Sequence, residues 1–275
     1  MVKKIIHLAD IHIPNENCDR PYSDMIKQMI AEILLEVKDC EKDSVRIVLA
    51  GDIFDKKIKT DNESKTVLHE MLNFLNQLGK TIIVAGNHDM LENNTDRMDS
   101  LTPTFTINGV YPNITYIDKI LNYKSGYVID DNVIWALYSM FDKFAKPNID
   151  GLREKYPDSR IIGLYHGDIE GAVTDLGRMS EGGIDTKNFK ECDCVMAGHI
   201  HKFQEIRKNG VPIVYSGSVF QKDGGENITG HGFLVWDIEK MAYKFHEVPN
   251  KHRILRYEIS SYEDIKNDTE RLINL

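Results

Sequence analysis

The sequence predicts an α/β protein whose first part is built on a parallel β-sheet. Three short apolar runs rich in β-branched residues alternate with two longer stretches whose apolar residues recur every three or four positions. This strand–helix–strand–helix–strand order is typical of parallel strands joined by right-handed crossovers. The first run leads directly into Asp10, and the other two lead through one glycine into Asp52 and Asn87. Open α/β sheets bind ligands at such strand ends. With 275 residues, 41% of them hydrophobic, one large domain is expected.

The first two expected strands both end in potential ligands. The first covers 4–9 and runs into Asp10-Ile11-His12. Apolar residues at three- and four-residue steps then predict a helix over 25–37. The second strand, 46–50, leads into Gly51-Asp52-Ile53-Phe54-Asp55. Both strands therefore deliver acidic or imidazole side chains at their carboxyl ends.

The third strand follows the second expected helix. That helix is predicted to begin at a capping box formed by Thr60 and Glu63 and to end at Gly79. The strand, 81–85, is short and β-branched, which indicates a buried strand rather than a helix. It leads into Gly86-Asn87-His88-Asp89, whose amide and imidazole groups suit a metal ion and a phosphate oxygen.

Beyond residue 89, extended segments replace the strand–helix alternation. Segments between 113 and 140 suit a second sheet packed on the first. Two later apolar runs, 160–165 and 194–197, end in His166-Gly167-Asp168 and Gly198-His199-Ile200-His201. Three further strands are expected over 212–216, 232–237 and 242–248.

Composition narrows the function classes. No apolar run reaches the roughly 18 residues of a membrane span and no signal peptide is visible, so a cytoplasmic protein without membrane partners is expected. The cysteines lack the C-x-x-C spacing of a zinc site and are expected to be reduced: Cys18, Cys40, Cys192 and Cys194. The net charge of −9 argues against a broadly basic surface, so contact with nucleic acid would be local or helped by metal ions.

Five ligand-bearing strand ends together predict a metal centre. They supply carboxylate, carboxamide and imidazole groups without thiolate, which suits Mn²⁺, Fe²⁺ or Zn²⁺ rather than a structural zinc cage. In a parallel sheet the carboxyl ends of neighbouring strands meet at one edge, so distant residues can share a site. The donors exceed the need of one ion, and a carboxylate can bridge, which favours two ions sharing Asp52. The candidates are Asp10, His12, Asp52, Asn87, His88, His166, His199 and His201, with Asp55 nearby.

Each histidine also has an ordinary interpretation. A histidine beside a glycine turn is often a surface or capping residue, but five such strand ends together favour the metal centre. His7 lies inside the first strand and is expected to be packed in the core. No role is assigned to the histidines outside the motifs, which are His69, His231, His246 and His252.

The motifs resemble the ordered motif set of the calcineurin-like metallophosphoesterases. The set comprises Asp10-x-His12, Gly51-Asp52-x-x-Asp55, Gly86-Asn87-His88-Asp89, His166 and Gly198-His199-x-His201. The resemblance implies a four-layer αββα sandwich, in which two mixed β-sheets are flanked by helices and a dinuclear centre lies at one edge. It places this domain in residues 1–250.

The resemblance also implies a role for each residue. One ion would be held by Asp10, His12, Asp52 and His201, and the other by Asp52, Asn87, His166 and His199. His88 would lie outside the metal ligands, contact the phosphate and protonate the leaving oxygen. Catalysis by two-metal hydrolysis of a phosphodiester would then involve Asp52, Asn87 and His88.

A narrower resemblance is to SbcD-type repair nucleases and the recombination endonuclease subunits of T4-like phages. It rests on Gly51-Asp52-Ile53-Phe54-Asp55, His199-Ile200-His201-Lys202, Tyr215-Ser216-Gly217-Ser218 and Gly232-Phe233-Leu234-Val235-Trp236-Asp237. It implies a Mn²⁺-dependent DNA exonuclease and endonuclease of double-strand break repair or recombination, partnered by an SbcC-like ABC-type ATPase with a long coiled coil. A phage protein of this kind would work in the host cytoplasm.

Residues 251–275 are expected to form a linking strand over 253–259 and a helix over 261–275. The narrower resemblance implies that these elements begin a DNA-capping domain. Lys56, Lys57 and Lys59 follow the Asp52 loop, where they either grip a nucleic-acid backbone or form a solvated loop. The resemblance implies a homodimer contact on the apolar surface of helix 66–78, whereas an apolar helix face of this kind usually packs in the core.

Three other functions share parts of this pattern. A phosphatase or small-molecule phosphodiesterase would use the same ligands but a closed pocket. A non-catalytic scaffold would be expected to have a broken ligand set, whereas this set is intact. A plain nucleic-acid-binding module would be expected to carry a basic stripe, which the charge balance does not support.

Overall fold

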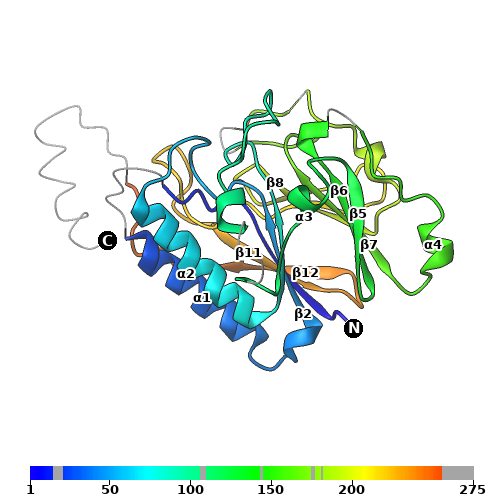
Figure 1. Cartoon of the computed structure of the whole chain (residues 1–275), viewed down its shortest axis with the longest axis horizontal. Coiled ribbons are helices and arrows are strands. Elements are labelled where there is room, and N and C mark those ends of the chain that lie inside the picture. Colours follow the sequence, from blue (N-terminus) through cyan, green and yellow to red (C-terminus); the bar gives the residue numbers. More distant parts are fainter. Residues whose placement is uncertain (15–20, 106–109, 143–144, 175–176, 181, 256–275) are drawn as a thin grey trace, which may run out of the picture.

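The computed structural model describes residues 1–14, 21–105, 110–142, 145–174, 177–180 and 182–255. In these residues twelve strands form two six-stranded sheets that pack face to face (Figure 1). The first sheet has the order β12-β11-β1-β2-β3-β4 and the second β5-β6-β7-β8-β10-β9. Both sheets mix parallel and antiparallel pairs, as the fold-class prediction requires.

The first sheet carries the strand–helix alternation of the N-terminal part. Strands β1, β2, β3 and β4 are parallel neighbours, and β11 and β12 extend the sheet antiparallel beyond β1. The bounds are β1 (Lys4–Leu8), β2 (Val45–Ala50), β3 (Lys80–Val84), β4 (Ile114–Tyr116), β11 (Gly232–Asp237) and β12 (Ala242–Glu247). The predicted strands over 4–9, 46–50, 81–85, 232–237 and 242–248 are thus confirmed to within one residue at each end.

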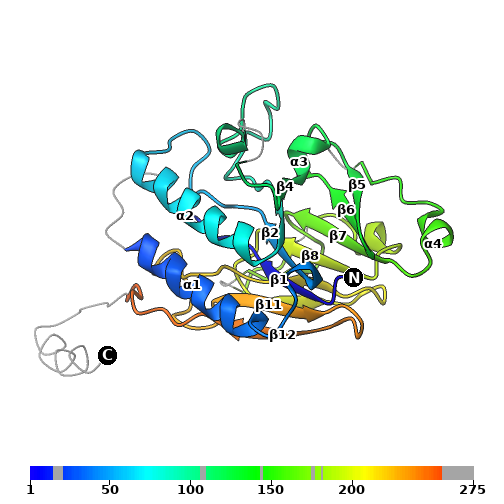
Figure 2. The ribbon, with the colours of Figure 1, turned by 60° about the horizontal axis from the view of Figure 1, so that its bottom comes forward.

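Two helices cover the outer face of the first sheet. Helices α1 (Tyr22–Val37) and α2 (Asn62–Leu78) lie side by side there (Figures 1 and 2). Their buried side chains, such as Met29 and Leu72, pack with Leu49 of β2 in one apolar cluster. The regularly spaced apolar residues that predicted both helices therefore form the face that each helix buries.

The predicted start of α2 is wrong by one residue. The cap is Asp61, whose side chain accepts a hydrogen bond of 2.7 Å from the Ser64 amide, and Thr60 lies before the helix. Asp61 has the extended backbone that an N-cap needs, and its carboxylate caps the helix in place of the expected capping box of Thr60 and Glu63. Gly79 ends the helix as predicted.

The second sheet holds the remaining strands. Its bounds are β5 (Gly126–Asp130), β6 (Val133–Tyr138), β7 (Arg160–His166), β8 (Cys194–Gly198), β9 (Gln204–Ile206) and β10 (Ile213–Tyr215). The prediction that segments over 113–140 belong to this sheet is only partly right, because β4 pairs with β3 of the first sheet. The short β9 was not predicted, since among its three residues only Ile206 is buried.

Apolar clusters fill the space between the layers. Trp135 and Ile162 of the second sheet pack with Val48 and Trp236 of the first. The outer face of the second sheet is covered by Leu152 of the short helix α4 (Leu152–Lys155), by Phe189 and by loops. The other short helical segments are α3 (Ile117–Ile120) and the 3₁₀ turns Lys42–Ser44, Thr102–Phe105, Met140–Asp142 and Thr186–Phe189. The four-layer sandwich is confirmed.

Several smaller expectations can be compared with the described residues. His7 is fully buried, as predicted. Cys40, Cys192 and Cys194 are free thiols, whereas Cys18 lies outside the described residues. No described helix is long and apolar enough to cross a membrane.

The predicted C-terminal elements are largely untested, because most of them fall outside the described residues. Residues 253–255 form no strand, and everything from 256 onward is not described.

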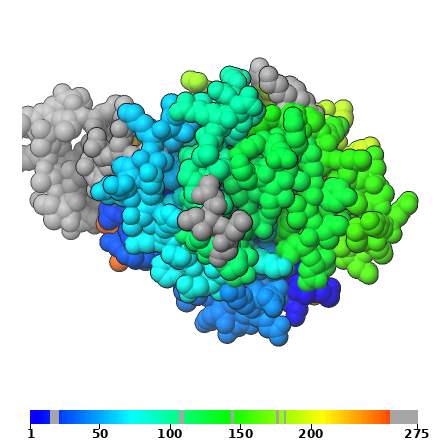
Figure 3. Space-filling model, viewed as in Figure 1, coloured from blue at the N-terminus to red at the C-terminus, as the bar shows by residue number. Residues whose placement is uncertain are grey.

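The apolar residues of α2 lie mainly in the core, although Phe74 remains partly exposed. On the face shown in Figure 3, α2 (cyan) lies beside the segment leading to β4, where Asn76 pairs with Asn113.

Candidate metal centre

The carboxyl ends of the two sheets meet and bring the predicted residues together. Asp10, Asp52 and Asn87 follow β1, β2 and β3 of the first sheet, whereas His166 and His199 come from the ends of β7 and β8 in the second. The expectation that one parallel sheet edge gathers all five ends is thus corrected. The chain crosses to the second sheet after β4, so the site lies at the junction of two sheets.

The backbone at this junction is unusual for non-glycine residues. Asp10 (φ 53°), His12 (φ 50°), Asp52 (φ 53°) and His199 (φ 100°) all have positive φ angles. Such conformations cost on the order of 1–3 kcal/mol each and persist where the surrounding structure imposes them. These conformations lower the stability of the fold and turn the four side chains toward one another.

Backbone hydrogen bonds fix the loops relative to each other. The Asp10 amide donates to the Gly51 carbonyl (3.1 Å) and the His12 amide to the Asp52 carbonyl (3.0 Å). The Asp10 carboxylate accepts the His199 amide at 2.9 Å, which ties the first sheet to the second. These hydrogen bonds hold the loops that carry Asp10, His12, Asp52 and His199 in a fixed arrangement.

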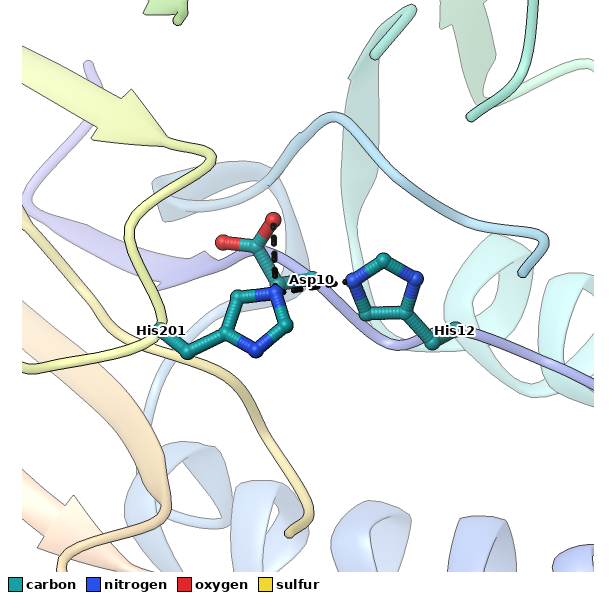
Figure 4. Close-up of side chains that lie close together, drawn as sticks. All are labelled: Asp10, His12 and His201. Carbon is teal, nitrogen blue, oxygen red and sulfur yellow. Dashed lines mark hydrogen bonds and ion pairs between the residues drawn. The ribbon is translucent and has the colours of Figure 1, made fainter. Parts of the chain in front are cut away.

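One cluster of possible ligands contains Asp10, His12 and His201 (Figure 4). The Nε2 atoms of His12 and His201 face each other at 2.9 Å, and His201 Nε2 lies 4.0 Å from Asp10 Oδ1. His12 Nε2 is also 3.7 Å from Asp52 Oδ2. Two imidazole nitrogens and two carboxylates therefore converge on one small volume, as ligands of a divalent cation would.

The second cluster contains Asp52, His166 and His199, with Asn87 beside them. His166 Nε2 is 3.3 Å from Asp52 Oδ1 and 3.2 Å from Asn87 Oδ1. His199 Nδ1 is 2.9 Å from the same Asn87 oxygen. Asp52 thus presents one carboxylate oxygen to each cluster.

Two glycines are required for this close approach. A Cβ atom on Gly51, which has φ 96°, would lie 2.1 Å from His166 Nδ1. A Cβ atom on Gly86 would lie 2.1 Å from Asp52 Oδ1. Larger residues at either position would push a candidate ligand out of place.

Each cluster has a histidine whose outer nitrogen is held by a hydrogen bond. His166 Nδ1 donates to the Ala50 carbonyl at 2.7 Å, and His201 Nδ1 donates to the Glu226 carboxylate at 2.5 Å. A proton on Nδ1 leaves the lone pair of Nε2 directed into the cluster. This is the arrangement usual for metal-binding histidines.

The buried charges perturb one another strongly. Burial raises the pKa of Asp10 to about 6, although nearby His201 and His166 oppose the shift. Burial also opposes ionisation of Asp52, but the neighbouring His166 outweighs it and holds the pKa of Asp52 well below its usual range. Burial lowers the pKa of His12. Such a concentration of shifted groups is characteristic of functional sites.

His88 lies beside both clusters. Its amide donates to Asp52 Oδ1 at 2.8 Å, and its Nδ1 donates to the Asp55 carbonyl. Its ring stands edge-on to His12, with centroids 4.9 Å apart. His88 also belongs to a third group of potential metal ligands, with His12 and Asp55. That His88 does not bind a metal ion therefore stays a prediction.

Three supporting residues were not assigned a role from the sequence. The buried Asp89 carboxylate accepts the amides of Ile53, Phe54 and Gly86, which joins two of the ligand loops. Glu226 holds His201, and Lys222 pairs with Asp55 at 3.1 Å. Asp89 lies within a motif and had a visible signal. Glu226 and Lys222 lie in a polar loop with no periodic pattern, so their contacts are visible only in the fold.

A cavity of about 330 Å³ opens beside Asn87 and His199. Tyr165, Met140 and Asp168 line it, together with Glu92, which pairs with Lys57 at 3.1 Å. Lys57 thus pairs with a residue of the cavity lining, and both interpretations of the lysine loop stay predictions. The cavity gives a substrate room next to the second cluster.

Known proteins resemble this chain to different degrees. The uncharacterized protein R555 of Acanthamoeba polyphaga mimivirus is 31% identical over 259 residues, which cover 91% of this chain and 18% of the viral protein. The DNA double-strand break repair protein Mre11 of Archaeoglobus fulgidus is 24% identical over 232 residues, which cover 80% of this chain and 51% of that protein. The chain thus spans about half the length of the archaeal relative and less than a fifth of the viral one.

Among solved structures, a putative 5'-nucleotidase from Staphylococcus aureus, in complex with alpha-ketoglutarate, aligns over 98% of this chain and 58% of that chain. Its TM-score is 0.44 at 15% identity. The calcineurin-like phosphoesterase family model matches residues 3–203 and so includes all the candidate ligands. Because this match extends over well more than half of the sequence, the chain belongs to the calcineurin-like phosphoesterase family.

Proposed function

We propose that this phosphoesterase is a two-metal nuclease that hydrolyses phosphodiester bonds in DNA. The observation that carries the proposal is the position of Asp52 between the clusters. One of its oxygens is 3.7 Å from His12 Nε2, and the other is 3.3 Å from His166 Nε2. A carboxylate so placed can bridge two ions, and a bridged pair suits phosphoester hydrolysis.

The donor set fits two divalent ions, most simply Mn²⁺. The first ion would be held by Asp10, His12, Asp52 and His201, and the second by Asp52, Asn87, His166 and His199. Oxygen and imidazole donors without thiolate suit Mn²⁺, Fe²⁺ or Zn²⁺, and the resemblance to SbcD-type nucleases favours Mn²⁺ among them. When bound, such ions activate water and offset the charge of the phosphate.

The chain's own residues would do the rest of the work. His88 has its Nδ1 proton engaged by the Asp55 carbonyl, which leaves Nε2 to contact the phosphate and, when protonated, to donate to the leaving oxygen. The Asn87 side-chain amide would donate to a phosphate oxygen as charge develops in the transition state. Burial of Asp10 and Asp52 keeps the donors in place and limits their contact with bulk water.

Similarity to the archaeal double-strand break repair protein and the narrower SbcD-like motifs support DNA as the substrate. By the same analogy the partner would be an SbcC-like coiled-coil ATPase, a homodimer would form, and the work would be repair or recombination in the cytoplasm. Residues 1–250 would be the nuclease domain and 251–275 the start of a DNA-capping region. With a net charge of −9, the metal ions would supply much of the attraction for DNA.

The experiment is degradation of an end-labelled DNA duplex and a single strand with Mn²⁺, using wild type beside His88→Ser and a bis-aryl phosphodiester as a control substrate. DNA loss that requires both Mn²⁺ and His88 supports the nuclease. Hydrolysis of the control diester with intact DNA would contradict DNA as the substrate of this chain, while leaving the phosphoesterase activity in place.

A small-molecule phosphodiesterase or phosphatase is the second candidate. The observation in its favour is the cavity beside Asn87 and His199, whose described lining contains the acidic Glu92 and Asp168 but no Lys or Arg. Such a lining does not attract the further phosphates of a polymer. Turnover of nucleoside 2',3'-cyclic or aryl esters much faster than DNA would favour this function.

A further inference from the structure

A loop beyond the family match closes against the first cluster. Residues 221–226 lie between β10 and β11, outside the matched residues 3–203. Glu226 Oε1 accepts the Nδ1 proton of His201 at 2.5 Å, while Oε2 accepts the Lys222 amide at 2.8 Å. Both carboxylate oxygens are thus occupied, and the side chain is only 9% exposed. Glu226 is held rigidly against the back of a candidate ligand.

The hydrogen bond sets which nitrogen of His201 faces the cluster. With Nδ1 donating to Glu226, the ring turns Nε2 toward His12 Nε2 (2.9 Å) and Asp10 (4.0 Å). A carboxylate on the outer nitrogen also makes an imidazole a stronger donor to a metal ion. Both effects act on the ion of the first cluster.

The other candidate histidines have different support. His166 Nδ1 donates to a neutral carbonyl, that of Ala50. His199 Nε2 is 3.8 Å from the nearest Asp168 oxygen, which is beyond hydrogen-bond distance. His12 Nδ1 has no hydrogen-bond partner in the described part of the chain. Within the described residues, His201 is therefore the candidate ligand that a carboxylate holds directly.

We propose that Glu226 is a positioning residue for His201, and that it strengthens binding of the ion at Asp10, His12 and His201 without affecting the second ion. This inference rests on the proposed pair of metal ions. It adds a residue that none of the motifs contains. Loss of such a partner typically costs about 10- to 100-fold in metal affinity.

The loop has a second anchor that does not depend on the Glu226 carboxylate. The Gln221 side chain accepts the Ile254 amide at 2.8 Å and donates to the Ile254 carbonyl at 3.1 Å. It also donates to the Glu226 carbonyl at 3.3 Å. Replacing only the Glu226 carboxylate therefore leaves the loop attached to the C-terminal segment, and the variant is expected to fold.

The test is calorimetric titration of the metal-free full chain with Mn²⁺, comparing wild type, Glu226→Gln and Glu226→Ala. The matched control is Glu32→Gln, which removes a similar carboxylate from His246 Nε2 (3.0 Å) on the helix side of the first sheet. We expect two ions in wild type and in Glu32→Gln. Affinity for one ion should fall about 10- to 100-fold in Glu226→Ala, and less in Glu226→Gln because the amide oxygen still accepts the proton.

Two results would count against the proposal. Unchanged affinity for both ions in the Glu226 variants would overturn it. Equal weakening of both ions together with a lower melting temperature would show a general structural role instead. If Glu226→Ala fails to fold, Glu226→Gln decides between these outcomes, because loss of the carboxylate charge alone should still lower affinity for one ion. If the wild-type protein binds no Mn²⁺, the proposed function itself is overturned. This outcome is distinct from one in which wild type binds two ions and only the role of Glu226 is wrong.

Discussion

The two clusters of the candidate centre are supported in different ways. In the first, His201 is held by a side chain, Glu226, from a loop outside the motifs. In the second, His166 is held by the backbone carbonyl of Ala50, at the end of β2. The support of His166 therefore cannot be removed by a side-chain substitution, whereas the support of His201 can be removed by a substitution in a loop. We expect the two proposed ions to respond differently to substitutions around them.

The largest effect is expected at Asp52, because it contributes to both clusters. Asp52→Ala should abolish the distinction between them by weakening both ions. The loss of activity should exceed the roughly 10²–10⁴-fold contribution of a general acid or base. Steady-state rates with a bis-aryl phosphodiester and Mn²⁺ measure the loss of activity, and Mn²⁺ titrations measure the affinity for each ion. A variant that retained wild-type affinity for one ion would show that Asp52 serves one cluster only.

His88 belongs to neither proposed ligand set, and its replacement separates catalysis from metal binding. His88→Ser should lower the turnover rate by roughly 10²–10⁴-fold while both ions remain bound. Rates and Mn²⁺ titrations on the same preparation measure the two properties. Loss of one ion would instead assign His88 to the possible ligand group with His12 and Asp55.

The sequence predicted the elements well where burial is periodic, as in the helices, or continuous, as in the central strands. The spacing of Met29 and Ile33 in α1 and the β-branched run of β2 follow directly from the faces that they bury. The candidate ligands were found because each follows such a run. The positive φ angle of Asp10 and the contact of Glu226 could not be predicted, since both result from long-range packing rather than from a local pattern.

A buried carboxyl group that holds the backbone just before the second cluster predicts an effect of pH on stability. Asp118 accepts the Ala85 amide at 2.8 Å, just before Gly86 and Asn87, and burial raises the pKa of its carboxyl to about 7. The folded state therefore binds this proton more tightly than the unfolded state, whose pKa is near 3.8. The contribution of Asp118 to stability should be full below pH 4 and decline as the pH rises to 7.

Asp118→Asn should make the free energy of unfolding of the metal-free protein less dependent on pH between 4 and 7. Urea denaturation at several pH values measures this dependence. Asp10 and Asp89 also have raised pKa values, so part of the dependence should remain. A slope identical to that of wild type would show that Asp118 does not titrate in this range.

The smallest effect is expected at Asp168. Its nearest oxygen is 3.8 Å from His199 Nε2, and its side chain is 51% exposed, so it is not a counterpart of Glu226. Asp168→Asn should change affinity for the second ion by less than the roughly 10-fold lower limit for a hydrogen-bonded partner. A larger loss in a Mn²⁺ titration would show that carboxylates support both clusters equally.

Anomalous diffraction from crystals of the Mn²⁺-bound chain would show whether Asp52 bridges a pair of ions. The expected result is two manganese peaks roughly 3.5–4 Å apart, as in other two-metal sites, with the Asp52 carboxylate between them. One peak should lie against Asp10, His12 and His201, and the other against Asn87, His166 and His199. A single peak, or two peaks that do not share Asp52, would contradict it.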